Sequence, residues 1–411
     1  MILLLLFFIF VNYKKHITWF SMIQVHNLMW LVAFILYFFN FVGYYPMNER
    51  IYLYSFIYII FFNLFFLNSK VDVNKYLRKN FDIISKKMSN SIYDKRCIIS
   101  SVIAYFLSFN ILSKSLPILF GSGNLSDGMN LLRYQTYTNI SIFNTFDLVL
   151  MSYIIRPIFV VTILLFSLKL ATKTVNLKLT FFALLDALML IAMTAGRALI
   201  ISMIIYVVAA FLCFNKVKLS FIKKYKKYLL LIIPVFIFFI FISSQRVNRN
   251  NGVIVEFLIY IFSGLPYMSK LLEACPIEPF TLMGKGVLSP IFDTIGLLLR
   301  FFGFNSILAS QTISHFTSTS LYVADGIQMN AAASTLLTFY LDFGIYGVAL
   351  GASLVAIFSK KIEKLVIKNP SCLNLAIYLF VFVSVILMVQ NYTLGNASTL
   401  FTIIFIIILL R

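Results

Sequence analysis

The sequence contains few of the residues that hold metals or form disulfides. Its 411 residues include only four cysteines and three histidines. No Cys-x-x-Cys pair and no Cys/His cluster has the spacing of a zinc site. In the topology derived below, Cys275 is the only cysteine on the oxidising side, so no disulfide within the chain is expected. We therefore predict no metal, no cofactor and no redox chemistry.

Acidic residues are also scarce. Aspartate and glutamate number 14 against 34 lysines and arginines, and charged residues make up only 12% of the chain. No Asp-x-Asp pair could hold a divalent metal under a nucleotide-sugar, and no Walker loop could bind ATP. The formal charge of +20 would suit a nucleic-acid partner. The lysines, however, lie in short loops beside apolar runs and not on a soluble domain, so no nucleic acid is expected.

Long apolar runs dominate what remains, since 61% of the residues are hydrophobic. That apolar surface is too large for one water-soluble core and requires lipid. The runs do not alternate as barrel strands do, and backbone groups in lipid must pair within their own segment. The sequence therefore predicts an all-α polytopic transmembrane bundle of about eleven spans: 1–13, 28–46, 51–68, 97–119, 146–168, 179–195, 198–214, 228–243, 335–358, 371–389 and 398–410.

The basic residues orient these spans. Of the 34, 24 fall in loops on one side of the predicted bundle, and that side should be cytoplasmic. Residues 1–243 then hold eight spans, with a short periplasmic loop near 120–145. A large periplasmic loop occupies 244–334, and 335–411 hold the last three spans. Two apolar stretches within the large loop, 253–265 and 287–309, are predicted to be helices at the membrane interface.

Arginine is enriched on the predicted periplasmic side. Seven of its ten basic residues are arginines, counting Arg156, whereas the cytoplasmic loops use mostly lysine. A guanidinium binds phosphate through two parallel hydrogen bonds and keeps its charge in a dry pocket. Arg133, Arg197, Arg246 and Arg249 lie at the mouths of spans, and we predict that they bind a phosphate-bearing substrate. Headgroup anchoring is the alternative for each of them.

Arg156 and Asp186 are predicted to lie at similar depth in neighbouring antiparallel spans. A lone charge in the middle of a bilayer costs about 2.5–3.5 kcal/mol on insertion scales. A structural ion pair between them is therefore expected, with a proton relay as the alternative.

His315 is the one histidine of the large loop, and its imidazole could accept a proton from a sugar hydroxyl near neutral pH. It is our candidate catalytic base, with Glu256 and Asp325 as rivals. The stretch Asp342-Phe343-Gly344-Ile345-Tyr346-Gly347 opens the ninth span. Its glycines permit close helix packing, which is the favoured role of this stretch, and the alternative for Asp342 is to cap or orient a neighbour.

These features together resemble the O-antigen polymerases, the Wzy-type oligosaccharide repeat-unit polymerases. The resemblance lies in the span count, the Gly196-Arg197 hairpin, the large loop after the eighth span and the Asp342-Phe343-Gly344-x-x-Gly347 entry into the next. It implies a GT-C-like fold in the bacterial inner membrane, active at its periplasmic face. It also implies undecaprenyl-diphosphate-linked oligosaccharides as substrates, arginines on the diphosphate, and a chain-length regulator protein as a candidate partner.

Two rival functions stay open. An O-antigen ligase has a similar architecture but transfers glycan to the lipid A core. A lipid-linked oligosaccharide flippase needs cations along a central path and usually two similar halves, and the chain has no internal repeat. A solute transporter is disfavoured for the same reasons.

Overall fold

The computed structural model describes residues 1–15, 17–18, 21–66, 72–121, 123–137, 142–196, 198–214, 253–330 and 333–411. Helices make up nearly all of the regular structure in these ranges. Of the eleven predicted spans, ten overlap helices, and the remaining one, 228–243, lies outside the described residues. Six helices of the described part are long and apolar enough to cross a membrane, and four more are apolar but shorter. The chain is therefore a helical membrane protein.

Contacts divide the chain into two compact units. Unit 1 comprises residues 1–75, 254–368 and 384–400, and unit 2 comprises 76–253, 369–383 and 401–411. Each unit is assembled from segments far apart in the sequence. The predicted three-part division follows the membrane topology, and it stays a prediction.

In unit 1, α1 (Ile2–Lys14) packs on α2 (Met22–Phe38), α2 on α3 (Glu49–Phe66), and α3 along α17 (Thr335–Lys368). A buried polar network ties α2 to α3. His26 stacks on Phe62 and its Nε2 lies 3.1 Å from the hydroxyl of Tyr58, while Asn27 and Asn63 exchange amide hydrogen bonds of 2.8 and 2.9 Å. Paired amides satisfy each other in an apolar interior, which fixes the register of the two helices.

The segment between residues 253 and 330 also belongs almost wholly to unit 1. It forms α13 (Val253–Phe262), α14 (Gly264–Ala274), α15 (Ser289–Phe301) and α16 (Ala309–Thr317). Helices were predicted in both of its apolar stretches, and both are confirmed. A short hairpin of β1 (Leu321–Ala324) and β2 (Ile327–Met329) follows, turning at Gly326 with φ +67°, and is the exception to the all-α prediction.

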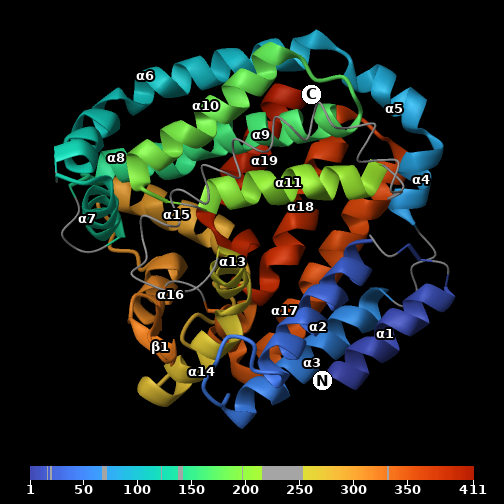
Figure 1. The fold of residues 1–411 in the computed structure, drawn as a ribbon, viewed down its shortest axis with the longest axis vertical. Coiled ribbons are helices and arrows are strands. Elements are labelled where there is room, and N and C mark those ends of the chain that lie inside the picture. Colours follow the sequence, from blue (N-terminus) through green and yellow to red (C-terminus); the bar gives the residue numbers. More distant parts are fainter. Residues whose placement is uncertain are drawn as a thin grey trace. The chain divides into compact units, whose positions relative to one another are not determined.

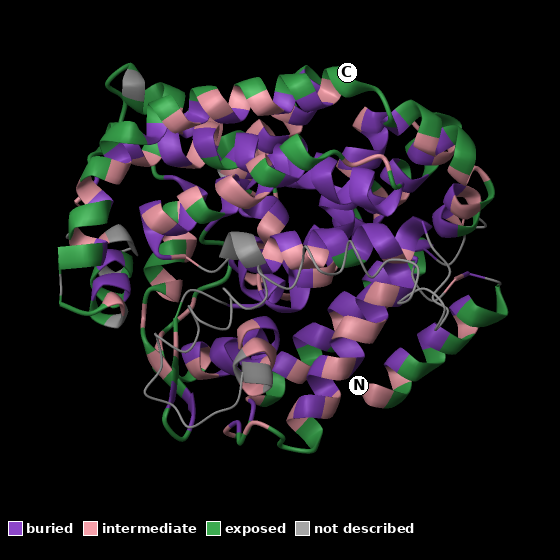
Figure 2. Ribbon diagram, turned by 45° about the horizontal axis from the view of Figure 1, so that its top comes forward, coloured by how far each residue is buried: buried purple, intermediate pink, exposed green. Residues whose placement is uncertain are grey.

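In unit 2, the 31-residue α6 (Ser91–Gly121) runs alongside α9 (Arg156–Ala171) and α10 (Leu177–Thr194), and α11 (Ala198–Phe214) packs on α9. Asp94, Ser101, Ser108 and Ser115 recur every seventh residue of α6 and are all buried, so one stripe of the helix faces its neighbours. Every residue of α9 after Arg156 is buried, which explains why its sequence is apolar on all sides. Figure 2 shows such buried helices in purple and the exposed faces of outer helices in green.

The remaining elements of unit 2 are shorter. Two helices, α4 (Val73–Lys79), which begins in unit 1, and α5 (Phe81–Met88), occupy the basic segment before α6. α7 (Leu125–Tyr137) follows α6, and α8 (Thr145–Leu150) continues through a π-helical turn, η1 (Met151–Ile155), into α9. α18 (Cys372–Ile386) leads into the 3-10 turns η2 (Leu387–Val389) and η3 (Thr393–Gly395) and then α19 (Ala397–Leu410). The boundary between the units falls within α18 and α19.

Two predicted boundaries were wrong. The second span was placed at 28–46, but α2 begins at Met22, because the Ser21 side chain accepts a hydrogen bond from the backbone of Gln24 and caps the helix. The loop near 120–145 is largely helical, since α6 continues to Gly121 and α7 follows at once. The second span was thus placed several residues too late in the sequence, and the fourth was ended before α6 ends.

Candidate functional site

A cavity of about 180 Å³ lies within unit 1. Three segments form its walls: one face of α16, the start of α17, and the turn 391–396 that contains η3. The lining consists of Ser310, Ile313, Ser314, Thr317, Ala333, Leu337, Thr338, Asn391, Tyr392, Gly395 and Asn396. None of these side chains is charged. Hydroxyls and carboxamides alternate with apolar groups and one aromatic ring, so the cavity can form several neutral hydrogen bonds.

The α16 wall follows from the spacing of its residues. Ser310, Ile313, Ser314 and Thr317 stand at helical intervals of three and four, which places them on one face. His315 is on the same helix but is exposed and is not among the lining residues. Its ring packs edge-on against Phe316, with centroids 5.8 Å apart. The predicted catalytic base therefore lies one residue from a cavity-lining serine, outside the cavity itself.

A buried aspartate positions α16. Asp293, on α15, is fully buried, and its carboxylate accepts hydrogen bonds from the backbone N–H groups of Ala309 (2.7 Å) and Ser310 (3.0 Å). These donors belong to the first turn of α16 and have no partner within their own helix. A negative charge there is also favoured by the helix dipole. Asp293, one of two charged residues within the apolar stretch 287–309, thus orients one wall of the cavity.

A chain of hydrogen bonds links Asp342 to the wall formed by the turn 391–396. Its buried carboxylate accepts hydrogen bonds of 2.8 Å each from the N–H groups of Gly286 and Val287. The carbonyl of Val287 in turn accepts a hydrogen bond from the hydroxyl of Tyr392, and Ser289 donates to the carbonyl of Gly395. Tyr392 and Gly395 both line the cavity. Of the two roles considered for Asp342, these bonds support the orienting one, and the oriented neighbour is the segment that precedes α15.

Removing the α16 cap is expected to loosen the helix. Asp293→Ala would leave one buried and one partly buried N–H group without partners and should lower the free energy of unfolding by about 1–2 kcal/mol. Hydrogen–deuterium exchange should rise selectively in residues 309–317. Asp325→Ala is the matched control, because this carboxylate is exposed in the hairpin turn and bonds to the hydroxyl of Tyr45. Equal exchange in both variants would contradict the positioning role.

The predicted arginine cluster is largely beyond what the structure describes. Arg197, Arg246 and Arg249 lie outside the described residues, as does the side chain of Glu256. Arg133 is described, and it is exposed on α7 in unit 2. That the four arginines bind one phosphate-bearing substrate stays a prediction.

The predicted ion pair between Arg156 and Asp186 is not formed among the described residues. Asp186 is fully buried, and its two carboxylate oxygens accept hydrogen bonds from Ser101 (2.9 Å) and from Tyr105 (2.5 Å), both on α6. Arg156 is exposed at the start of α9. The prediction was wrong because two residues at similar depth in the membrane need not point toward each other. The hydroxyls of α6, which the comparison of depths did not include, bond to Asp186 instead.

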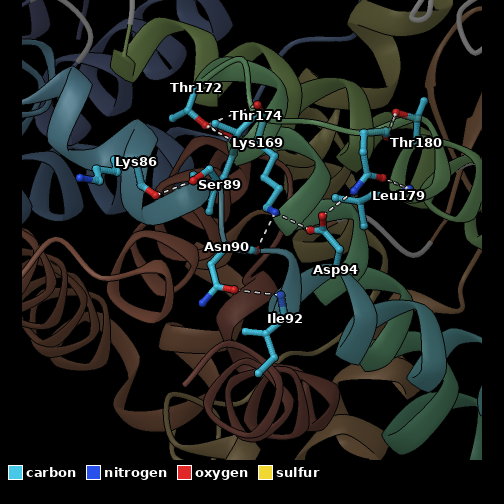
Figure 3. Close-up of polar contacts among 12 residues, drawn as sticks. Lys86, Ser89, Asn90, Ile92, Asp94, Lys169, Thr172, Thr174, Leu179 and Thr180 are labelled. Carbon is cyan, nitrogen blue, oxygen red and sulfur yellow. Dashed lines mark hydrogen bonds and ion pairs between the residues drawn. The ribbon is translucent and has the colours of Figure 1, made fainter.

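Two other ion pairs form among the residues of unit 2 that the structure describes. Lys169 of α9 is fully buried, and its Nζ lies 2.6 Å from Oδ1 of Asp94 and 3.0 Å from the carbonyl oxygen of Asn90. Figure 3 shows Lys169 pointing between these two residues at the start of α6. Asn176, which caps α10, donates to the other oxygen of Asp94. Farther along α6, Lys114 pairs with Asp147 at 2.5 Å. The Lys169–Asp94 pair joins α9 to the start of α6, and the Lys114–Asp147 pair joins the far end of α6 to α8. We interpret both pairs as structural.

Sequence reasoning missed the residues that line the cavity. The signals that could have found them are the Ser310-x-x-x-Ser314-x-x-Thr317 spacing on an amphipathic helix and the polar interruption Gln390-Asn391-Tyr392 between two apolar spans. Neither pattern is specific, since both occur on ordinary solvated helices and loops.

Comparison with known proteins adds no assignment. No protein-family description, no curated protein and no solved structure matches this chain.

Proposed function

We propose that the chain is a membrane glycosyltransferase that polymerises oligosaccharide repeat units carried on undecaprenyl diphosphate. The observation that carries the proposal is the uncharged, hydroxyl- and amide-lined cavity with one aromatic ring, set within a helical membrane protein. Sugars are recognised by such mixed polar and aromatic linings. The segment of about 90 residues between the eighth and ninth predicted spans supplies one full wall of it.

In the proposed reaction, a hydroxyl of a lipid-linked repeat unit attacks the anomeric carbon of the growing glycan. A new C–O glycosidic bond forms as the C–O bond to the diphosphate breaks, and the lipid diphosphate leaves with the bonding electrons. His315, exposed on α16 next to the cavity-lining Ser314, is the candidate acceptor of the hydroxyl proton. The predicted arginines Arg133, Arg197, Arg246 and Arg249 would stabilise the departing charge, a task worth about 3–4 kcal/mol for a single well-placed donor.

The proposal places the protein in the bacterial inner membrane, with the cavity at the periplasmic face and a GT-C-like arrangement of spans. The predicted lysine-rich loops support this orientation through the positive-inside rule. A chain-length regulator remains a candidate partner.

The test is the lipopolysaccharide of a deletion strain. Loss of a polymerase should leave one repeat unit on the core, and the wild-type chain should restore the full ladder. Bare core would indicate a ligase, and repeat units trapped on the cytoplasmic leaflet would indicate a flippase; either result would overturn the proposal. In vitro, the purified protein should convert lipid-diphosphate-linked repeat units into polymer and free lipid diphosphate.

Substitutions at two positions test the assigned roles. Arg197→Ala should lower the polymerisation rate by about two orders of magnitude, whereas Arg197→Lys should retain part of it. His315→Gln should lower the rate by about 10²–10⁴-fold, because it removes the proposed proton acceptor. Full laddering by Arg197→Ala at wild-type expression would remove that residue from the site.

A further inference from the structure

The cavity of unit 1 differs chemically from a diphosphate site. A diphosphate needs cations or a dense array of donors, and burying an unpaired anion is prohibitively costly. All eleven lining residues are uncharged. The carboxylates of Asp293 and Asp342, which bond to backbone N–H groups behind the walls, offer no positive charge to an anion.

The cavity is also unlike a lipid-tail groove. Four lining hydroxyls come from Ser310, Ser314, Thr317 and Thr338, and two carboxamides come from Asn391 and Asn396. An acyl or prenyl chain would cover these groups without forming hydrogen bonds to them. The free-energy cost is about 1–3 kcal/mol for each polar group that is buried without a partner. A polyhydroxylated ligand can satisfy them.

An unpartnered acceptor indicates where such a ligand would bond. The side-chain oxygen of Asn391 is buried and has no hydrogen-bond partner in the described part of the chain. The backbone N–H of the same residue is bonded to the carbonyl of Leu387, which fixes the backbone from which the carboxamide extends. Buried polar atoms in native proteins almost always have partners, and an orphan at a cavity wall suggests that the partner is a ligand or water.

Further orphans lie close to the same wall in the sequence. The hydroxyl oxygens of Ser334 and Thr335 are also buried without partners in the described residues, and both directly follow the lining residue Ala333. The volume of about 180 Å³ far exceeds the 10–15 Å³ that one water needs. It is large enough for a single sugar ring.

We infer that this cavity is a subsite for one uncharged sugar ring of the substrate, with Asn391 accepting a hydrogen bond from a ring hydroxyl. This inference rests on the proposed function for the identity of the substrate, and it adds that the diphosphate binds outside this cavity. Tyr392, held by its bond to Val287, presents an aromatic ring in the same wall for contact with the sugar.

The test measures binding directly with the full-length protein in detergent micelles. The probes are methyl glycosides of neutral hexoses, the matching uronic acids, and inorganic diphosphate, followed by saturation-transfer-difference NMR. Neutral glycosides should give transfer signals, whereas uronic acids should give at least tenfold weaker ones. Competition by diphosphate, or equal binding of the uronic acids, would overturn the inference.

Two variants connect binding to the cavity. Asn391→Leu removes the unpartnered acceptor with nearly the same volume, and Ser314→Trp fills the space; each should weaken neutral-glycoside binding at least tenfold. Ser318→Trp is the matched control, because this residue is exposed at the end of α16 and does not line the cavity. Unchanged melting temperatures would show that both test variants fold. Wild-type binding by both would place the sugar elsewhere and refute the inference.

The two proposals fail separately. If neutral glycosides bind the wild-type chain and not Asn391→Leu, while the deletion strain keeps a complete ladder, the subsite stands and the polymerase assignment fails. If deletion reduces the ladder to one repeat unit but no neutral glycoside binds the wild-type chain, the polymerase assignment stands and the subsite fails.

Discussion

Replacing Gly347 by alanine is expected to destabilise the protein by about 2–3 kcal/mol, through overpacking against backbone that cannot move aside. A Cβ at this position would lie 2.1 Å from the carbonyl oxygen of Phe339. The close approach arises because α17 is broken at Phe343 and Gly344, where the dihedral angles leave the helical region. Gly344 has φ +59° and ψ −138°, a conformation that L side chains rarely adopt. The break therefore depends on both glycines.

The measurement is the melting temperature of the detergent-purified protein, followed by loss of the monodisperse peak on size exclusion. Gly121→Ala is the control, because no atom lies within 4 Å of a Cβ built there. It should leave the melting temperature unchanged or raise it slightly. A Gly347→Ala protein as stable as this control would show that α17 is not broken as described.

Lys169→Met should destabilise unit 2 by about 3–5 kcal/mol, since it leaves Asp94 as a buried charge without its cation. The side chains of Lys169 and Asp94 are only 1% and 5% exposed, so solvent cannot compensate. Removing both charges in Lys169→Met/Asp94→Asn should recover most of the loss, because the asparagine oxygen can still accept from Asn176. Removing one partner of a buried ion pair lowers the free energy of unfolding far more than replacing both partners by uncharged residues.

The cycle of single and double variants is read by denaturant unfolding in micelles. Lys178→Met, on the exposed face of α10, is the control and should change the free energy of unfolding by less than about 0.5 kcal/mol. If the double variant is no more stable than Lys169→Met, the two residues do not interact and the tie between α6 and α9 is refuted.

Much of the helical layout could be predicted because apolar length is a direct physical requirement of a bilayer. Runs such as 51–68 and 179–195 reappear as α3 and α10 within a few residues. Boundaries failed where a polar cap decided the helix end, as Ser21 does for α2. Capping depends on a single hydrogen bond, which hydropathy does not register.

The candidate site was predicted much less completely. Asp342 was singled out, and its orienting role is supported by the bonds to Gly286 and Val287. The neutral residues of the cavity were not found, because serine, threonine and asparagine carry no pattern that separates a ligand wall from a solvated face. His315 was chosen because its imidazole can accept a proton. It follows the cavity-lining Ser314 in the chain, and its role as a catalytic base stays a prediction.

By itself, the sequence determined that this chain is a helical membrane protein with few acidic groups and mostly apolar spans. Only the tertiary structure decided which polar groups meet: Asp186 with the hydroxyls of α6, Lys169 with Asp94, and the turn at Asn391 with α16. The reason is that burial in lipid acts on each segment separately, whereas hydrogen bonds and ion pairs depend on how helices are rotated against each other. That rotation is set by side chains distant in the sequence.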